Sequence, residues 1–124
     1  MDLEERARSF FAALGRSEPH AVLGFLSDGA VYDVQGVLAP MDKATFERYL
    51  RGVRQRLPEA SFEIATVAVK RNVTFVEWQR RGRRTDGSQD EGEGVHILSW
   101  DQDGRIAHAT VHTKRPVLRP GELN

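Results

Sequence analysis

The second half of the sequence consists of long β-rich segments separated by short turn signals, and this arrangement restricts the possible folds most strongly. Arg71-Asn72, Asp86-Gly87 and Asp101-Gln102-Asp103-Gly104 each lie between runs of β-branched and aromatic residues. Turn residues of these kinds between such runs favour β-hairpins. We therefore expect four consecutive strands that form an antiparallel meander.

The first half carries helical periodicity instead. Apolar residues recur at helical spacing over residues 3–14, 17–26 and 42–57. Ser17 and Asp42 are suitable N-caps for the second and third helices, and Pro58 ends the third. Residues 30–35 have the composition of a strand. The order of these elements predicts an α+β domain.

Composition indicates one domain and excludes several classes of partner. The 124 residues suffice for one hydrophobic core, so we expect a single domain over residues 1–115 and a loosely ordered tail over 116–124. Eighteen basic and eighteen acidic residues cancel, so we expect no nucleic-acid partner. The N-terminus is acidic and no apolar run could span a bilayer, so we expect no membrane partner and a cytoplasmic location.

Metal ions and other cofactors are not expected. The chain has no cysteine, and its four histidines do not stand at metal-ligand spacing. No glycine-rich phosphate loop precedes a helix. The basic run over residues 80–84 faces acidic residues across its own hairpin, so we expect it to form cross-strand ion pairs rather than a ligand site.

The register of the central hairpin determines which side chains share a face of the sheet. A two-residue turn at Asp86-Gly87 places Glu77 opposite His96 and Trp78 opposite Val95. One face then carries Phe62, Ile64, Phe75, Glu77, Gln79, His96, Leu98 and Trp100. The other face carries Val67, Val69, Val76, Trp78, Val95 and Ile97. Because three short helices cover only one apolar face, we expect a homodimer through the outer one.

Asp33 and His96 are the ionisable residues that interrupt apolar strand patterns on the expected inner face. Burial would raise the pKa of a carboxyl group at Asp33 toward the range useful for proton abstraction. A solvated edge-strand aspartate and a hydrogen-bonded core histidine are the alternative interpretations. If both residues face one cavity, a catalytic pair is favoured.

Two segments of the chain, Leu26–Asp33 and Gly94–Ile106, resemble the nuclear-transport-factor-2-like superfamily in the entry to its first strand and in its penultimate hairpin. That superfamily includes ketosteroid isomerases, SnoaL-type polyketide cyclases, limonene epoxide hydrolases and scytalone dehydratases. The resemblance covers nearly the whole chain and implies three helices packed in the concave face of a strongly curved, mostly antiparallel sheet. Such folds carry many chemistries and also pure binding modules.

The resemblance also implies roles for individual residues. Asp33 falls where ketosteroid isomerases keep the aspartate that shuttles a proton, and His96 falls where they keep a protonated aspartic acid. Phe10 stands where those enzymes have an oxyanion-binding tyrosine, so the isomerase triad is incomplete. In this interpretation Asp33 is the general base, His96 the proton donor, and Glu77 orients the imidazole.

These inferences predict a cofactor-free domain that binds a small hydrophobic or aromatic molecule in an apolar pocket. The residues expected to line the pocket are Phe10, Leu14, Phe25, Tyr49, Phe75, Leu98 and Trp100. The chemistry would be that of an acid/base isomerase, cyclase or dehydratase. The alternative is a non-catalytic ligand-binding or dimerisation module with the same fold.

Overall fold

Three helices and one five-stranded sheet make up the fold in the computed structural model, which describes residues 1–16, 18–119 and 121–122. The helices are α1 (Leu3–Arg16), α2 (Pro19–Leu23) and α3 (Lys43–Arg56). The strands are β1 (Leu26–Val34), β2 (Glu59–Lys70), β3 (Val73–Arg83), β4 (Gln89–Trp100) and β5 (Ile106–Lys114). In the described part of the chain, no helix is long and apolar enough to cross a membrane.

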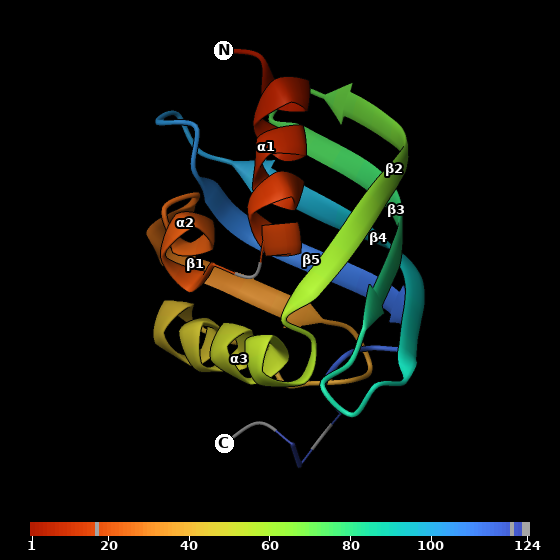
Figure 1. The fold of residues 1–124 in the computed structure, drawn as a ribbon. Coiled ribbons are helices and arrows are strands. Elements are labelled where there is room, and N and C mark those ends of the chain that lie inside the picture. The colour runs from red at the N-terminus through yellow and green to blue at the C-terminus, as the bar shows by residue number, and fades with distance from the viewer. Residues whose placement is uncertain (17, 120, 123–124) are drawn as a thin grey trace.

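The sheet has the order β1-β5-β4-β3-β2, with β1 parallel to β5 and every other pair antiparallel. Figure 1 shows α1 lying against β2, α3 running alongside β1, and the sheet curving around the helices. Phe10, Phe11 and Phe46 fill the space between the helices and the sheet and are almost completely buried. This arrangement confirms the α+β architecture expected from the order of the elements.

Local sequence accounts for the helix boundaries. The Asp42 carboxylate accepts a hydrogen bond from the Thr45 amide at 2.8 Å, which is the cap expected at the start of α3. The second helix is shorter than predicted, because it ends at Leu23 and the chain enters β1 at Leu26. The predicted cap at Ser17 lies outside the described residues.

The turn between β3 and β4 differs from the expected two-residue turn. The Arg84 amide donates to the Ser88 carbonyl at 2.8 Å, and the Gly87 amide donates to the Arg84 carbonyl at 2.9 Å. The connection is therefore a three-residue loop, and Gly87 adopts the left-handed conformation at φ 90° that this loop type requires. The longer loop shifts the pairing of the two strands by one residue.

A one-residue shift moves every side chain of β3 to the opposite face. Trp78 pairs with Gly94 and Val76 with His96, so the predicted pairing of Glu77 with His96 is wrong. Val76 and Trp78, which were expected outside, are 0% and 3% exposed, and Phe75, expected inside, is 39% exposed. The assignment of β4 stands, since His96, Leu98 and Trp100 are buried.

The segment after β5 packs onto the domain. Val117 and Leu118 are buried, and the Arg84 guanidinium donates to the Val117 carbonyl at 3.3 Å. For residues 116–119, this packing differs from the loosely ordered tail expected over residues 116–124, and residues 120 and 123–124 lie outside the described part of the chain. The two apolar side chains that follow Pro116 gain burial by docking, which a count of prolines does not reveal.

Candidate ligand-binding site

A small cavity of ≈ 70 Å³ lies between α1, α3, the inner face of the sheet and the C-terminal segment. Its walls are mainly apolar, with Leu14, Leu50 and Phe62 among them. The polar side chains that reach it are Tyr32, Tyr49, Trp78, Arg80, His96 and Thr113. A mostly apolar cavity with a few convergent polar groups is the usual form of a small-molecule site.

A wider groove of ≈ 1060 Å³ runs between α1 and the adjoining ends of β2 and β3. Arginines line it, namely Arg8, Arg16, Arg81, Arg83 and Arg84, together with Glu18 and Glu59. Most of these side chains are exposed, and the groove is open to solvent. Among residues 1–16, 18–119 and 121–122, no three potential metal ligands lie together. Because the groove is open and lined by exposed charged side chains, the interior cavity is the better candidate site.

His96 is buried and makes a hydrogen bond through each of its ring nitrogens. The indole Nε1 of Trp78 donates to His96 Nδ1 at 2.7 Å. On the other side of the ring, His96 Nε2 lies 2.6 Å from the Tyr32 hydroxyl oxygen. The three side chains form a continuous hydrogen-bond chain, Trp78–His96–Tyr32, and all three line the cavity.

The direction of this chain follows from the donor groups. An indole N–H only donates, so Nδ1 must accept and carries no proton. The proton of the neutral imidazole is therefore on Nε2, which donates to the Tyr32 oxygen. The Tyr32 hydroxyl hydrogen then has no acceptor among the described residues, and Tyr32 lines the cavity. Tyr32 is thus held as a hydrogen-bond donor toward any bound molecule.

Burial fixes the protonation states of both groups. Desolvation lowers the pKa of His96 from 6.5 to about 3, so the imidazole is neutral at physiological pH. Desolvation, followed by repulsion from a charged Tyr49, raises the pKa of Tyr32 well above its usual value of 10. Tyr32 therefore keeps its proton, and neither group accepts a proton readily near neutral pH.

The surrounding packing holds the Trp78–His96–Tyr32 hydrogen-bond chain in place. The Tyr32 ring stacks on Phe46 at a centroid distance of 3.9 Å, and the Phe11 ring meets His96 edge-on at 4.9 Å. Backbone hydrogen bonds of 2.8 Å in both directions join Tyr32 to Met41. A Cβ atom at Gly94 would lie 2.8 Å from Cζ2 of Trp78 and would also clash with the His112 carbonyl. The absence of a side chain at Gly94 leaves room for the indole.

Comparison with known proteins identifies the family. The family model for the SnoaL-like domain matches residues 7–109, which is most of the chain. The chain belongs to the SnoaL-like family. A search of curated proteins finds no match to the sequence.

Solved structures with the same fold share little sequence with this SnoaL-like domain. AusH from Aspergillus nidulans is 16% identical with a TM-score of 0.82, over 90% of this chain and 83% of AusH. An LEH-like epoxide hydrolase from M. tuberculosis is 17% identical with a TM-score of 0.76, over 90% of this chain and 82% of the hydrolase. An NTF2-like protein of unknown function from Exiguobacterium sp. 255-15 is 17% identical with a TM-score of 0.73, over 93% and 100% of the two chains. At these identities the likeness shows the fold alone.

The structure does not bring Asp33 and His96 to one cavity. Strand β1 alternates, so Tyr32 and Val34 face inward and Asp33 faces outward. Asp33 is partly exposed, and its carboxylate accepts a hydrogen bond from the side-chain amide of Gln35 at 2.6 Å. In this SnoaL-like domain, the inward-facing ionisable neighbour of His96 is Tyr32.

Glu77 also lies away from His96. Its carboxylate is on the outer face of the sheet and accepts a hydrogen bond from the Thr66 hydroxyl at 3.0 Å. Because of the register shift, the next residue along β3, Trp78, takes the position expected for Glu77 and orients the imidazole.

Of the other expected pocket residues, Leu14 and Tyr49 line the cavity. Phe10 lies behind it, with its ring centroid 6.4 Å from that of His96. Leu98 and Trp100 are core residues, and the partly buried Phe25 packs against the same core. Phe75 lies on the outer face for the reason given above.

Sequence reasoning missed Tyr32, Trp78 and Arg80 as cavity residues. Tyr32 has an inward neighbour at Val34, and this alternation could have shown that Asp33 points outward. Trp78 and Arg80 would have been placed correctly with a three-residue turn, which residues 85–87 with glycine in the last position permit.

Proposed function

We propose that this SnoaL-like domain binds a small, mostly apolar molecule through an oxygen atom that accepts a hydrogen bond from Tyr32. The observation that carries the proposal is the Trp78–His96–Tyr32 hydrogen-bond chain, which leaves the hydroxyl hydrogen of the cavity-lining Tyr32 without an acceptor among the described residues. The apolar walls would hold the hydrocarbon part of the ligand. A carbonyl or similar oxygen would complete the hydrogen bonding of Tyr32.

The same geometry favours binding over proton abstraction. None of the described residues that line the cavity carries a carboxylate. His96 uses Nδ1 to accept from Trp78 and has a pKa of about 3, so it is a poor general base near neutral pH. The described residues of the cavity therefore supply hydrogen-bond donors but no general base suited to neutral pH.

An acid/base enzyme that acts on a similar molecule is the competing function. Tyr32 could stabilise a developing enolate oxygen, which is half of what an isomerase, cyclase or dehydratase of this type needs. The other half is a base, and Asp33 would have to reach the ligand from the outward side of β1. The two functions differ in whether a carbon-bound proton of the ligand exchanges with solvent.

Acetophenone tests both functions, because it combines an aromatic ring with one carbonyl oxygen and exchangeable methyl protons. We expect it to shift the indole N–H signal of Trp78 in two-dimensional NMR more than that of Trp100, whose indole donates to Thr74 elsewhere. Tyr32→Phe should weaken binding about tenfold through the lost hydrogen bond. Asp33→Asn is the control and should bind within about twofold of the unmodified protein.

Deuterium exchange into the methyl group of acetophenone then distinguishes the two functions. A binding domain should leave the exchange rate in D₂O at its uncatalysed value. Accelerated exchange that is lost in Asp33→Asn would replace the binding function with the acid/base one. Equal binding to the unmodified protein and Tyr32→Phe would contradict both.

A further inference from the structure

A buried ion pair forms one end of the cavity. The side chains of Arg80 and Asp90 are 6% and 5% exposed, and Arg80 Nε donates to Asp90 Oδ2 at 2.6 Å. Arg80 Nη2 donates to Asp90 Oδ1 at 3.3 Å and to the Arg115 carbonyl at 2.6 Å. Arg80 also lines the cavity, whereas Asp90 does not.

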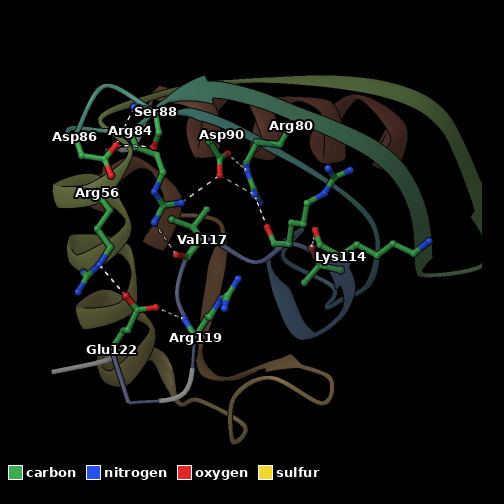
Figure 2. A network of polar contacts seen from close by, with 12 residues as sticks. Arg56, Arg80, Arg84, Asp86, Ser88, Asp90, Lys114, Val117, Arg119 and Glu122 are labelled. Atoms are coloured by element: carbon green, nitrogen blue, oxygen red, sulfur yellow. Dashed lines mark hydrogen bonds and ion pairs between the residues drawn. The ribbon is translucent and has the colours of Figure 1, made fainter.

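Two guanidinium groups share this one carboxylate. Arg84 Nη1 lies 3.3 Å from Asp90 Oδ1, and Arg84 Nη2 donates to the Val117 carbonyl at 3.3 Å. Figure 2 shows both arginines pointing at Asp90 from different sides. These three side chains carry one net positive charge close to a low-dielectric cavity, and Arg84 also interacts electrostatically with the exposed Asp86 carboxylate.

Arg80 has donor capacity that the protein does not use. Its Nε and Nη2 hydrogens are taken by Asp90 and Arg115, but Nη1 has no hydrogen-bond partner among the described residues. Tyr49 also lines the cavity, and its hydroxyl likewise has no hydrogen-bond partner in the described part of the chain. The positive charge of Arg80 acts on Tyr49, because it opposes the rise in the Tyr49 pKa that burial causes.

We propose that the ligand of this cavity is an anion, with a carboxylate bound by Nη1 of Arg80 and the hydroxyl of Tyr49. This rests on the proposed binding function and adds the charge of the ligand. A carboxylate would complement the charge of the Arg80 guanidinium at the cavity wall and satisfy donors that are otherwise unused. The apolar remainder of the molecule would extend toward Tyr32.

Entry of such a molecule requires the C-terminal segment to move. The cavity of ≈ 70 Å³ has room for about two water molecules, at about 30 Å³ each. Pro116 and Val117 form part of its wall. The segment is held by hydrogen bonds from Nη2 of Arg80 to the Arg115 carbonyl and from Nη2 of Arg84 to the Val117 carbonyl, so its movement would stretch these bonds and leave Nη1 of Arg80 available to the ligand.

Benzoate and acetophenone test the charge, because they have nearly the same shape and differ in charge. We expect benzoate to bind the full chain at least about tenfold more tightly, measured by NMR titration at one ionic strength. Arg80→Gln should abolish this preference. Arg84→Gln is the matched control: it removes the same charge beside the same carboxylate but not from the cavity wall, and should keep the preference within about threefold.

Two further measurements keep the test decisive if Arg80→Gln does not fold. Arg80→Lys retains the charge and should retain a preference for benzoate. In the unmodified protein, benzoate should shift the Nε–H signal of Arg80 more than that of Arg84. Equal affinity for the two ligands, or the same loss in Arg84→Gln as in Arg80→Gln, would overturn the anion proposal while leaving Tyr32-dependent acetophenone binding intact. Failure of both ligands to bind would instead contradict the proposed function.

Discussion

The indole of Trp78 donates to Nδ1 of His96 at 2.7 Å, and this single contact determines which nitrogen of the imidazole carries the proton. The two residues lie on adjacent strands but are not direct cross-strand partners, since Trp78 pairs with Gly94. Tyr32 is a hydrogen-bond donor to the cavity only because of this contact. Nitrogen-15 NMR of the imidazole should therefore show the Nε2–H form.

Acid should destabilise the domain through His96. Its pKa falls from 6.5 to about 3 on folding, so below pH 6.5 the unfolded chain binds a proton that the folded domain does not. The contribution is complete above pH 6.5 and is lost toward pH 3, by about 1.4 kcal/mol per pH unit. Urea unfolding should show a free-energy difference between the unmodified protein and His96→Gln that is constant above pH 6.5 and narrows at this rate as the pH falls below 6.5 to 5. A difference that stays constant below pH 6.5 as well would contradict the burial of a neutral histidine.

Gly94→Ala should destabilise the domain by at least about 2 kcal/mol, because the added methyl group meets both the Trp78 ring and the His112 carbonyl. The matched control is Gly29→Ala, where an added Cβ has no heavy atom within 4 Å. That variant should unfold within about 0.5 kcal/mol of the unmodified protein. Thermal unfolding followed by circular dichroism measures both, and similar values for the two variants would show that the space at Gly94 is not limiting.

The outer face of the sheet is the expected homodimer interface, where Ile97 lies as predicted and Phe75 lies instead of Val76 and Trp78. The cross-strand row Ala68, Phe75, Ile97 and Thr110 crosses this face. We expect light scattering to give about twice the chain mass of 14.0 kDa. Phe75→Glu should give a folded monomer, because Phe75 is 39% exposed in the single chain. Val76→Glu should unfold the protein, since Val76 is fully buried. A monomeric unmodified protein would show that this face of the sheet is not a homodimer interface.

Leu118 should contribute to the stability of the domain although it follows the last strand. It is fully buried, and a Cβ atom at Gly52 of α3 would lie 3.0 Å from its Cδ1. Leu118→Ala should cost about 2–4 kcal/mol in the free energy of unfolding. Val69→Ala, at a residue that is 47% exposed, should cost less than about 0.5 kcal/mol. Equal effects of the two substitutions would mean that the segment does not pack in solution.

The sequence was sufficient for the elements that depend on local signals. The Asp42 cap, the turn at Arg71-Asn72 and the turn that ends at Gly104 lie where capping and turn preferences place them. Each of these features depends on a few adjacent residues, so no distant contact is needed to predict it. The same holds for the α+β architecture, which follows from the order of the elements.

The candidate site was predicted less well because it depends on which alternate residues of a strand face the core. Asp-Gly is typical of a two-residue turn, but a three-residue loop that includes Thr85 also fits, and the two choices place opposite halves of β3 in the core. Asp33 interrupts an apolar strand pattern with a charge, which is typical of a functional residue. Tyr32 beside it fits the pattern of an ordinary core residue. Tertiary contacts with His96 and Phe46, which no local pattern encodes, give Tyr32 its role.

The pair Arg84 and Ser88 that closes the loop over residues 85–87 also restricts how this gene can change. The loop itself can change length without moving Trp78 or Arg80, provided that these two residues still pair. Deleting or inserting one codon between Arg80 and the loop would instead turn Trp78 and Arg80 to the outside of the sheet, unless a bulge in β3 or β4 restored the alignment. Homologues that keep the tryptophan and the arginine should therefore vary in length at the loop, and an odd length difference between these residues and the loop should coincide with a bulge.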